Sequence, residues 1–239
     1  MNLVLLDNES SEIVFNKTDY RYVHIVDTLK LSVGDSFKAG IINGFKGRAI
    51  IEKLNNDNII ARFLPEQNGV FSLPLILIIG HPRPTAAKRI IKDCASMGVS
   101  KILFFCGQNA EKSYMQSALW KKQEYKSALR EGAAQGGHTF LPEINVYKSL
   151  YDLIERNIFS LEKKVYFDIF EADFYSIPKA GSFVLAVGPE RGWTGDEIAL
   201  LKRSSFLSCS LGPTILRTET SCAAAVASAC VINNYFERK

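Results

Sequence analysis

From residue 73 onward, continuous apolar runs alternate with segments of helical spacing. The run 75–79 contains only Leu and Ile, as expected for a strand buried on both faces of a sheet. Helical spacing follows over 85–97, and Gly98 stands where such a helix would end. Strands that alternate with helices form largely parallel sheets. The sequence therefore predicts an α/β domain over 73–239.

Further strands are expected after the first helix of this domain, at 102–106, 165–170, 182–187 and 206–211. A long polar and basic helix is expected over 116–134. The last helix, over 218–236, contains the small-residue stretch 222–230. Small side chains allow close approach of another backbone, so we expect this helix to pack in the core, against ligand loops or against a second subunit.

The first 72 residues follow a different pattern, with short apolar runs and no long helix. The turn-forming residues 55–58 separate two of these runs and predict a hairpin. The segment 20–30 does not alternate cleanly, which leaves a helical turn open there. Several short strands without a long helix favour a small β-barrel over 1–72.

Bulk composition excludes several classes of protein. Apolar residues make up 47% and charged residues 23% of the 239 residues, as in ordinary globular proteins. No apolar run approaches the roughly 18–20 residues that span a bilayer, and the N-terminus lacks a signal-peptide pattern. We therefore expect a soluble, cytoplasmic protein without a membrane contact.

The cysteines and histidines give no pattern typical of a metal site. The five Cys form no CxxC pair, and most lie in apolar or Ala-rich surroundings, which favours buried, reduced thiols. His24, His81 and His138 are far apart in the sequence. No metal is therefore expected.

The charge balance is only mildly basic. The net charge is +4, and residues 1–72 hold 8 Lys and Arg against 9 Asp and Glu. A polyanionic partner is compatible with this balance but is not required by it.

Two segments near the C-terminus are the strongest candidates for a ligand site. They are Val187-Gly188-Pro189-Glu190-Arg191-Gly192-Trp193 and Leu211-Gly212-Pro213-Thr214-Ile215-Leu216-Arg217-Thr218-Glu219-Thr220. Each follows a strand-like run and places Gly and Pro where the strand should stop. Neighbouring loops of one sheet can form a single site, in which glycines let a flat ligand lie against backbone. Neither a GxGxxG fingerprint nor a P-loop is present.

The residues after each segment predict helix starts. Thr194 and Glu197 form a capping-box pattern, and Thr218 is placed to cap the last helix. Glu219 suits the positive end of the helix dipole, whereas Arg217 does not. Arg217 therefore indicates an anionic or electron-rich target.

These motifs resemble the RsmE family, SPOUT-class methyltransferases that methylate N3 of a uridine in small-subunit (16S) ribosomal RNA. The resemblance lies in Gly188-Pro189-Glu190-x-Gly192 and in Leu211-Gly212-x-x-Ile215-Leu216-Arg217-Thr218-Glu219-Thr220. Weaker likeness extends over 24–30 and 33–35 and over 134–144, so that it covers nearly the whole chain.

The resemblance implies a fold, a cofactor and partners. The fold would be a SPOUT α/β domain over 73–239 with a deep trefoil knot, preceded by a PUA-like, RNA-binding β-barrel over 1–72. The cofactor would be S-adenosylmethionine and the partner 16S rRNA or the small ribosomal subunit, with two copies forming a homodimer. The residues implied in cofactor binding are Val187, Gly188, Pro189, Glu190, Gly192, Leu211, Gly212, Ile215, Leu216 and Arg217.

Catalytic and RNA-binding roles follow in the same way. Arg217 would stabilise the uracil anion or fix a phosphate, and Glu219 and Glu190 are the candidate bases. RNA contacts are expected from the barrel, at Arg21, His24, Lys30, Lys46 and Arg48.

The chain departs from the family pattern at several positions. The family usually has Gly at Arg191 and Phe at Trp193, and it has charged residues at Ala134 and His138. Two alternatives stay open on the sequence: 2′-O-ribose methylation by another SPOUT enzyme, and an RNA-binding or ribosome-assembly factor without catalysis.

Overall fold

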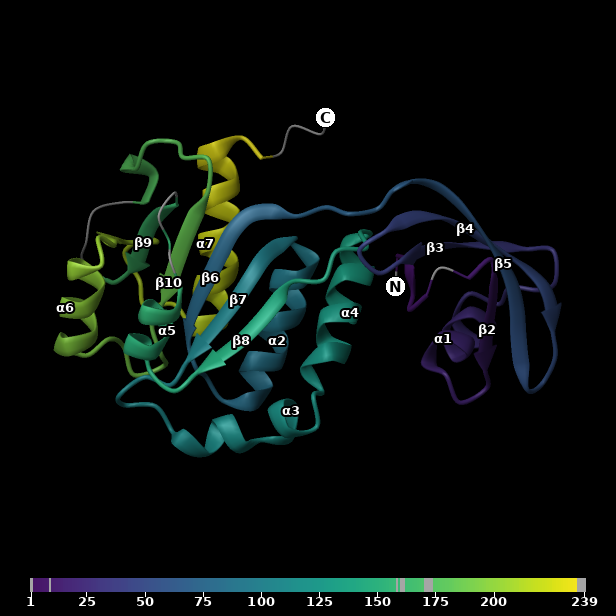
Figure 1. The fold of residues 1–239 in the computed structure, drawn as a ribbon, viewed down its shortest axis with the longest axis horizontal. Helices are drawn as coiled ribbons and strands as arrows, with labels where there is room; N and C mark the ends of the chain where they lie inside the picture. The colour runs from purple at the N-terminus through teal and green to yellow at the C-terminus, as the bar shows by residue number, and fades with distance from the viewer. Residues whose placement is uncertain (1, 9, 158, 160–161, 170–173, 236–239) are drawn as a thin grey trace. The chain divides into compact units, whose positions relative to one another are not determined.

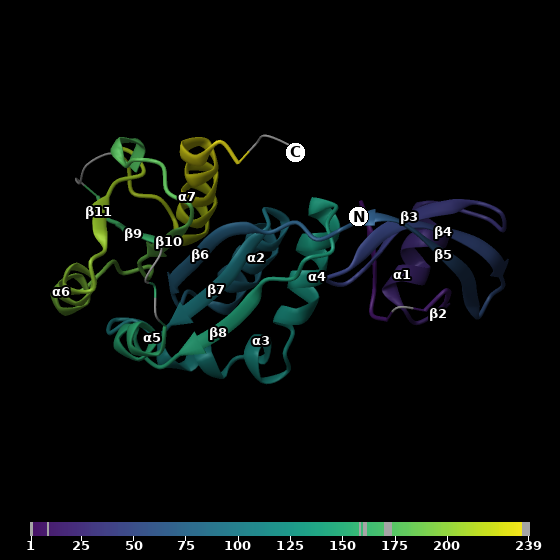
Figure 2. The same ribbon diagram turned by 45° about the horizontal axis from the view of Figure 1, so that its top comes forward.

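The computed structural model describes residues 2–8, 10–157, 159, 162–169 and 174–235. Its internal contacts divide the chain into two compact units, which are described separately below. The first comprises Met1–Phe71 with Ala133–Leu141, and the second comprises Ser72–Gly132 with Pro142–Lys239. Figures 1 and 2 show the helices and strands of both units.

The first unit is built on a five-stranded sheet in the order β1-β3-β4-β5-β2. β1 pairs with β3 in parallel, and the other neighbours are antiparallel. The strands are β1 (Val4–Leu6), β2 (Glu12–Asn16), β3 (Ser36–Ile41), β4 (Phe45–Leu54) and β5 (Asn58–Asn68). Sequence analysis missed β1, a three-residue strand in a segment that we had considered only as a possible signal peptide.

The hairpin predicted over 55–58 is confirmed by its side-chain hydrogen bonds. Oδ1 of Asn55 accepts from the backbone amides of Asp57, at 2.9 Å, and Asn58, at 2.8 Å. A short polar side chain thus replaces the backbone partners that the turn lacks, and β4 and β5 pair on either side of it.

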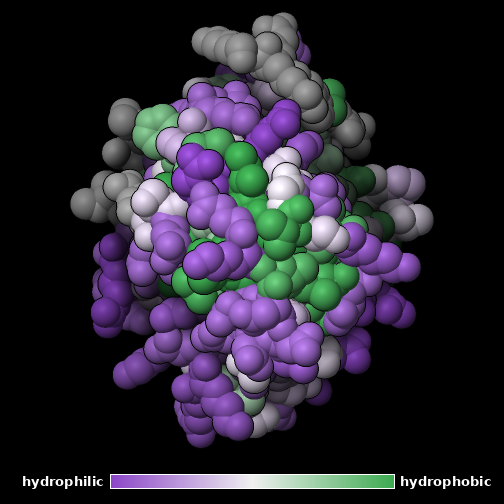
Figure 3. All heavy atoms as spheres, turned by 90° about the vertical axis from the view of Figure 1, so that its right-hand side faces the viewer, coloured by the Kyte–Doolittle hydropathy of each residue, from purple (hydrophilic) through white to green (hydrophobic). Residues whose placement is uncertain are grey.

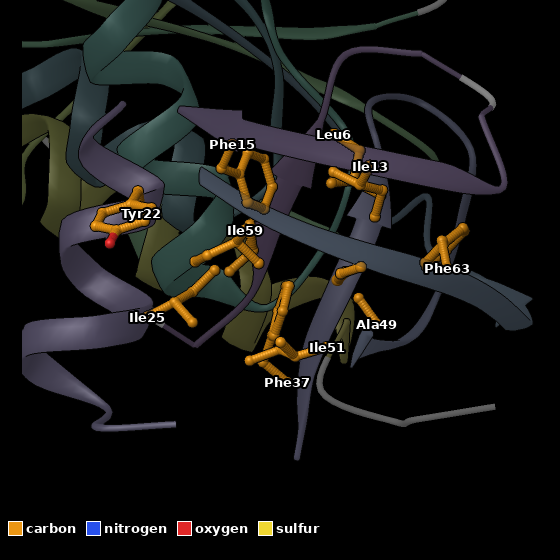
Figure 4. Packing of buried hydrophobic residues seen from close by; sticks show 13 residues of the cluster. Leu6, Ile13, Phe15, Tyr22, Ile25, Phe37, Ala49, Ile51, Ile59 and Phe63 are labelled. Carbon is orange, nitrogen blue, oxygen red and sulfur yellow. The ribbon is translucent and has the colours of Figure 1, made fainter. Parts of the chain in front are cut away.

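The segment 20–30 forms helical turns and not a strand. α1 (Tyr20–Val23) begins where the Asp19 side chain accepts from the Arg21 amide at 2.9 Å, and η1 (His24–Thr28) continues it. These turns direct Tyr22 and Ile25 toward the sheet, where they meet Phe15 and Ile59 in the core (Figure 4). A helical period explains why the apolar residues here do not alternate.

The second unit contains the predicted parallel α/β sheet. Six strands lie in the order β11-β9-β10-β6-β7-β8, and every neighbouring pair is parallel. They are β6 (Leu73–Gly80), β7 (Val99–Phe105), β8 (Glu143–Tyr147), β9 (Lys163–Phe167), β10 (Phe183–Val187) and β11 (Leu207–Cys209). The edge strand β8 was not predicted, and β11 is shorter than expected.

Helices cover both faces of this sheet (Figures 1 and 2). α5 (Leu150–Arg156) and α6 (Gly195–Arg203) pack on one face, against Ile78, Leu103 and Val184. α2 (Pro84–Ser96) and α7 (Thr218–Asn233) pack on each other and on β7 and β10. Burial on both faces explains why the central strands β6 and β10 are almost entirely apolar.

The prediction of one long helix over 116–134 is wrong, because this part of the chain forms three short helical segments. They are η2 (Lys112–Gln116), α3 (Ala118–Lys121) and α4 (Tyr125–Gly136). Gln123 adopts a left-handed backbone conformation with φ of 56°, which no continuous right-handed helix can contain. The predicted end of the last helix at 236 and of a strand at 170 lie outside the described residues.

No helix among the described residues is long and apolar enough to cross a bilayer. All five cysteines are buried, as predicted. Burial raises the pKa of the Cys94 thiol to about 12 and also raises the pKa of Cys222 well above its usual value.

We predict that thiol reagents label the native protein very slowly at neutral pH. The thiolate is the reactive form, and burial both disfavours it and blocks access. Labelling with a chromogenic disulfide reagent should be slow in buffer and should reach five thiols per chain in denaturant. Rapid labelling of the native protein at Cys94 or Cys222 would contradict this packing.

Candidate functional site

One cavity of about 640 Å³ lies where strands β9, β10 and β11 end. Its walls are the segments that follow these strands, together with Arg83 at the start of α2 and the first turn of α7. The carboxyl ends of parallel strands are the usual place for ligand sites in open α/β sheets.

All the residues predicted to bind the cofactor line this cavity. They are Val187, Gly188, Pro189, Glu190, Gly192, Leu211, Gly212, Ile215, Leu216 and Arg217. The candidate base Glu219 lines it as well. The structure thus brings both predicted loops to one site, while the role of each residue stays a prediction.

Trp193 shapes the loop after β10 from within. Its Nε1 donates to the Phe167 carbonyl at 2.9 Å, and its ring stacks on Phe105 with centroids 5.7 Å apart. A Cβ added at Gly188 would lie 3.1 Å from the Trp193 ring. The indole of Trp193 therefore lies directly against Gly188. A Phe at this position could not donate the hydrogen bond.

Pro189 packs between the ends of two strands. A Cβ at Gly80 would lie 2.3 Å from the Pro189 nitrogen, and a Cβ at Gly107 would lie 3.0 Å from its ring. Glycine is therefore required at Gly80, where the loop touches the end of β6.

The buried Glu197 fixes the start of α6. The predicted capping box with Thr194 is present, and the second oxygen of Glu197 accepts from the Gln108 amide at 3.0 Å. One carboxylate thus joins the loop after β10 to the loop after β7.

The Arg191 departure has a simple backbone explanation. Gly192 has φ of +74°, whereas Arg191 is not among the residues with positive φ. The glycine that the turn needs is Gly192, so Arg191 fits without strain. Its side chain is exposed at the edge of the cavity.

The loop after β11 is held by a short hydrogen-bonded turn. The Ser210 hydroxyl donates to the Gly212 carbonyl at 2.9 Å, and the Gly212 amide lies 3.1 Å from the same hydroxyl. Gly212 has φ of +132°, which side-chain-bearing residues rarely adopt. Beyond this turn Ile215 is 83% exposed and offers an apolar surface at the cavity.

Arg217 is the N-cap of α7 and lacks a side-chain capping bond. The prediction that Thr218 caps this helix is wrong, because Arg217 holds the extended conformation (ψ 152°) and Thr218 is the first helical residue. Among the described residues Arg217 forms no ion pair or side-chain hydrogen bond, so its guanidinium is available to a ligand.

Both candidate bases pair with arginines that sequence analysis missed. Arg83 lies 3.3 Å from Glu190, and Arg89 lies 3.6 Å from Glu219. The Glu219 side chain is 16% exposed and that of Glu190 is 40% exposed, so Glu219 is the better shielded from solvent. Arg83 precedes a helix, as Arg217 does, and the helix-dipole argument could have identified it.

The RNA-binding candidates of the first unit differ in their surroundings. Arg21 is engaged within the unit, since it pairs with Asp19 at 2.7 Å and Asp7 at 3.2 Å and lies over the Phe15 ring. It is better explained as a structural residue.

Among the residues described, no group of His, Cys, Asp and Glu could hold a metal.

Of the other RNA-binding candidates, Lys30 and Arg48 are exposed, whereas Lys46 and His24 are half-buried. Arg48 lies beside Glu66 at 3.4 Å, and Lys46 donates to the Gly137 carbonyl at 3.3 Å. Hydrophilic and hydrophobic side chains adjoin one another on the face in Figure 3.

The departures at Ala134 and His138 concern packing. Both are buried, and Ala134 packs with Leu3 and Leu5 in a core of the first unit. His138 contacts the Phe71 ring, with centroids 5.9 Å apart. The family's usual charges at these two positions are therefore replaced by buried residues, and no charge is missing from an exposed surface.

We predict that Gly80→Ala destabilises the second unit. The added methyl meets the Pro189 backbone, and overpacking of this kind costs about 1–3 kcal/mol. Thermal unfolding should show a midpoint lowered by several degrees, whereas Gly181→Ala, which adds its methyl to open space, should unfold as the wild type does. Equal midpoints for Gly80→Ala and wild type would contradict the contact.

Comparison with known proteins identifies relatives of this chain. A sequence family described as RNA methyltransferase domain matches residues 71–230. The ribosomal RNA small subunit methyltransferase E of Treponema pallidum is 34% identical, with 100% of this chain and 94% of that protein aligned. A Borreliella burgdorferi protein named ribosomal RNA small subunit methyltransferase E 1 is also 34% identical, over 94% of this chain and 95% of that protein.

Solved structures share the fold at lower sequence identity. The ribosomal RNA small subunit methyltransferase E of Neisseria gonorrhoeae, solved with bound S-adenosyl methionine, aligns with a TM-score of 0.82 at 19% identity. The alignment covers 98% of each chain. The two relatives at 34% identity and the matched family model show that the chain belongs to the ribosomal RNA small subunit methyltransferase E family.

Proposed function

We propose that this protein transfers a methyl group from S-adenosylmethionine to N3 of a uridine in 16S ribosomal RNA. The observation that carries the proposal is the single cavity formed by the two predicted loops. Its support is membership of a family whose named relatives are small-subunit rRNA methyltransferases. Family membership also favours N3 methylation over methylation of a ribose.

The residues at the cavity fit S-adenosylmethionine. A volume of about 640 Å³ lies within the usual range for cofactor sites. The exposed Ile215 and the half-buried Leu216 suit an adenine ring, while backbone groups around Gly188 and Gly212 suit the ribose. When bound, this cofactor supplies a methyl group on a positively charged sulfur.

The side chains around the cavity can meet the needs of the reaction. Uridine N3 carries a weakly acidic proton that must leave before or during attack, and the resulting anion places charge on the base oxygens. Arg217, which is unpaired among the described residues, is placed to stabilise that charge. Glu219 or Glu190 accepts the proton, and shielding from solvent favours Glu219.

We predict that Arg217→Ala lowers kcat for methylation of small ribosomal subunits by roughly 100-fold, the usual loss for one group that stabilises an oxyanion. Transfer of labelled methyl from S-adenosylmethionine to the subunits, with the product mapped by mass spectrometry, measures the effect. The control Arg203→Ala removes an exposed arginine at the end of α6, outside the cavity, and should be neutral. Near-normal turnover of Arg217→Ala would exclude a catalytic role.

In this proposal the first unit is a PUA-like barrel and binds the RNA. Antiparallel pairing of most of its strands, the exposed cations Lys30 and Arg48 and the half-buried Lys46 support this assignment. His24 is retained as a weaker candidate, while Arg21 is not, because its side chain is only 15% exposed and pairs with two carboxylates.

We predict that Arg48→Ala weakens binding to the ribosomal RNA and lowers the slope of log affinity against log salt by about 1, as expected for one lost phosphate contact. Filter binding at several salt concentrations measures the slope. Lys17→Ala, an exposed cation outside the proposed set, is the control. An unchanged slope for Arg48→Ala would remove this residue from the interface.

Two structural features complete the proposal. We include a trefoil knot near the C-terminus. The strand order supports it, because β10 and β11 lie on opposite sides of β9. We also include a homodimer. The stripe Ala224, Ala227 and Val231 on α7 supports it, because these residues stay partly or fully exposed. With ribosomal subunits as the substrate, the site of action is the cytoplasm.

A further inference from the structure

A second, smaller cavity of about 100 Å³ adjoins the methyl-donor cavity in the second unit. Pro189, Glu190 and Arg191 line both cavities. The remaining wall consists of His81, which follows β6, and of Asn109, Ala110, Glu111 and Tyr114. Neither of the predicted sequence motifs contains these five residues.

His81 presents an unsatisfied acceptor at this place. Its side chain is only 3% exposed, and its Nε2 has no hydrogen-bond partner within the described part of the chain. Its Nδ1 lies 2.8 Å from the Pro82 carbonyl oxygen. Because a carbonyl oxygen only accepts, Nδ1 carries the proton of the neutral ring and Nε2 keeps its lone pair.

The imidazole is held in this orientation by its neighbours. The Phe104 and Trp120 rings lie 5.6 Å and 5.3 Å from the His81 ring, and the His81 amide donates to the Phe105 carbonyl at 2.8 Å. Burial also lowers the pKa of His81, which keeps the ring neutral. A buried acceptor without a partner is costly, so one that a native structure retains calls for an explanation such as a functional role.

The size and lining of the cavity indicate the class of ligand. Its volume exceeds that of a single water molecule, which occupies about 30 Å³ in the liquid, and lies below the range for whole cofactors. A single planar ring fits this range. Tyr114 offers an aromatic face, and Arg191 offers a cation at the rim toward the donor cavity.

We propose that this cavity is a nucleobase subsite for the RNA substrate, in which His81 Nε2 accepts a hydrogen bond from an N–H group of the base. The inference rests on the proposed function, since the cavity shares Pro189, Glu190 and Arg191 with the cavity proposed for the methyl donor. Recognition of an unstacked base by hydrogen bonds to its edge and by an aromatic face is typical of RNA-binding proteins. His81 is thus a positioning residue for the substrate.

The test compares two substitutions of His81 in the full chain. His81→Phe keeps a ring but removes the acceptor, whereas His81→Gln keeps an acceptor near the position of Nε2. With small ribosomal subunits and labelled S-adenosylmethionine, we expect His81→Phe to raise KM for the subunits about tenfold while kcat stays within a few-fold of wild type. His81→Gln should restore most of the loss, and calorimetry should give unchanged affinity for S-adenosylmethionine in both.

A second variant tests the cavity independently, so that a folding defect in His81→Phe would not decide the result. Ala110→Phe fills the cavity from its opposite wall and leaves the histidine intact, and it should raise the same KM. An unchanged KM in both variants would overturn the subsite. So would a fall in kcat at constant KM, or an equal loss of S-adenosylmethionine binding. Absence of methyl transfer by the wild-type protein would instead overturn the proposed function.

Discussion

The site in the second unit depends on how closely the loop after β10 packs on the strand ends. Pro189 occupies space that a side chain at Gly80 would fill, and the Trp193 indole lies against Gly188. Trp193 is in turn fixed by its hydrogen bond to the Phe167 carbonyl at the end of β9. Because protein interiors are close-packed, these contacts fix the position of the loop after β10. The cavity, its exposed backbone and its bordering charges follow from that position.

Electrostatics around the cavity follow from the approach of α2 and α7. Arg83 and Arg89 come from α2 and lie near Glu190 and Glu219, while Arg217 ends the loop before α7. Two carboxylates are thus neutralised by partners, and one guanidinium is left for a ligand among the residues described. An electron-rich substrate and a cationic donor can both be held by such an arrangement, as the proposed methyl transfer requires.

The two cavities share one wall, and in our proposal one binds the cofactor and the other binds a nucleobase. The larger has the volume and the apolar and backbone lining that a cofactor needs, while the smaller offers a buried acceptor at His81. The turn from Pro189 to Arg191 lies between them, so a change in this loop would alter both sites. Arg191, where the family usually has glycine, stands at that border without backbone strain because Gly192 makes the left-handed turn.

The sequence by itself determined the parallel α/β class, the two loops that line the larger cavity and the capping box at Thr194, because these depend on local patterns of apolar, turn-forming and capping residues. Short strands such as β1 and β8 were missed, since few residues at a sheet edge carry too little pattern. Only the tertiary structure decided which residues meet: Arg89 with Glu219, the indole with Gly188, and His81 with the segment 109–114. These contacts join parts of the chain far apart in sequence, and their geometry is set by the packing of whole strands and helices.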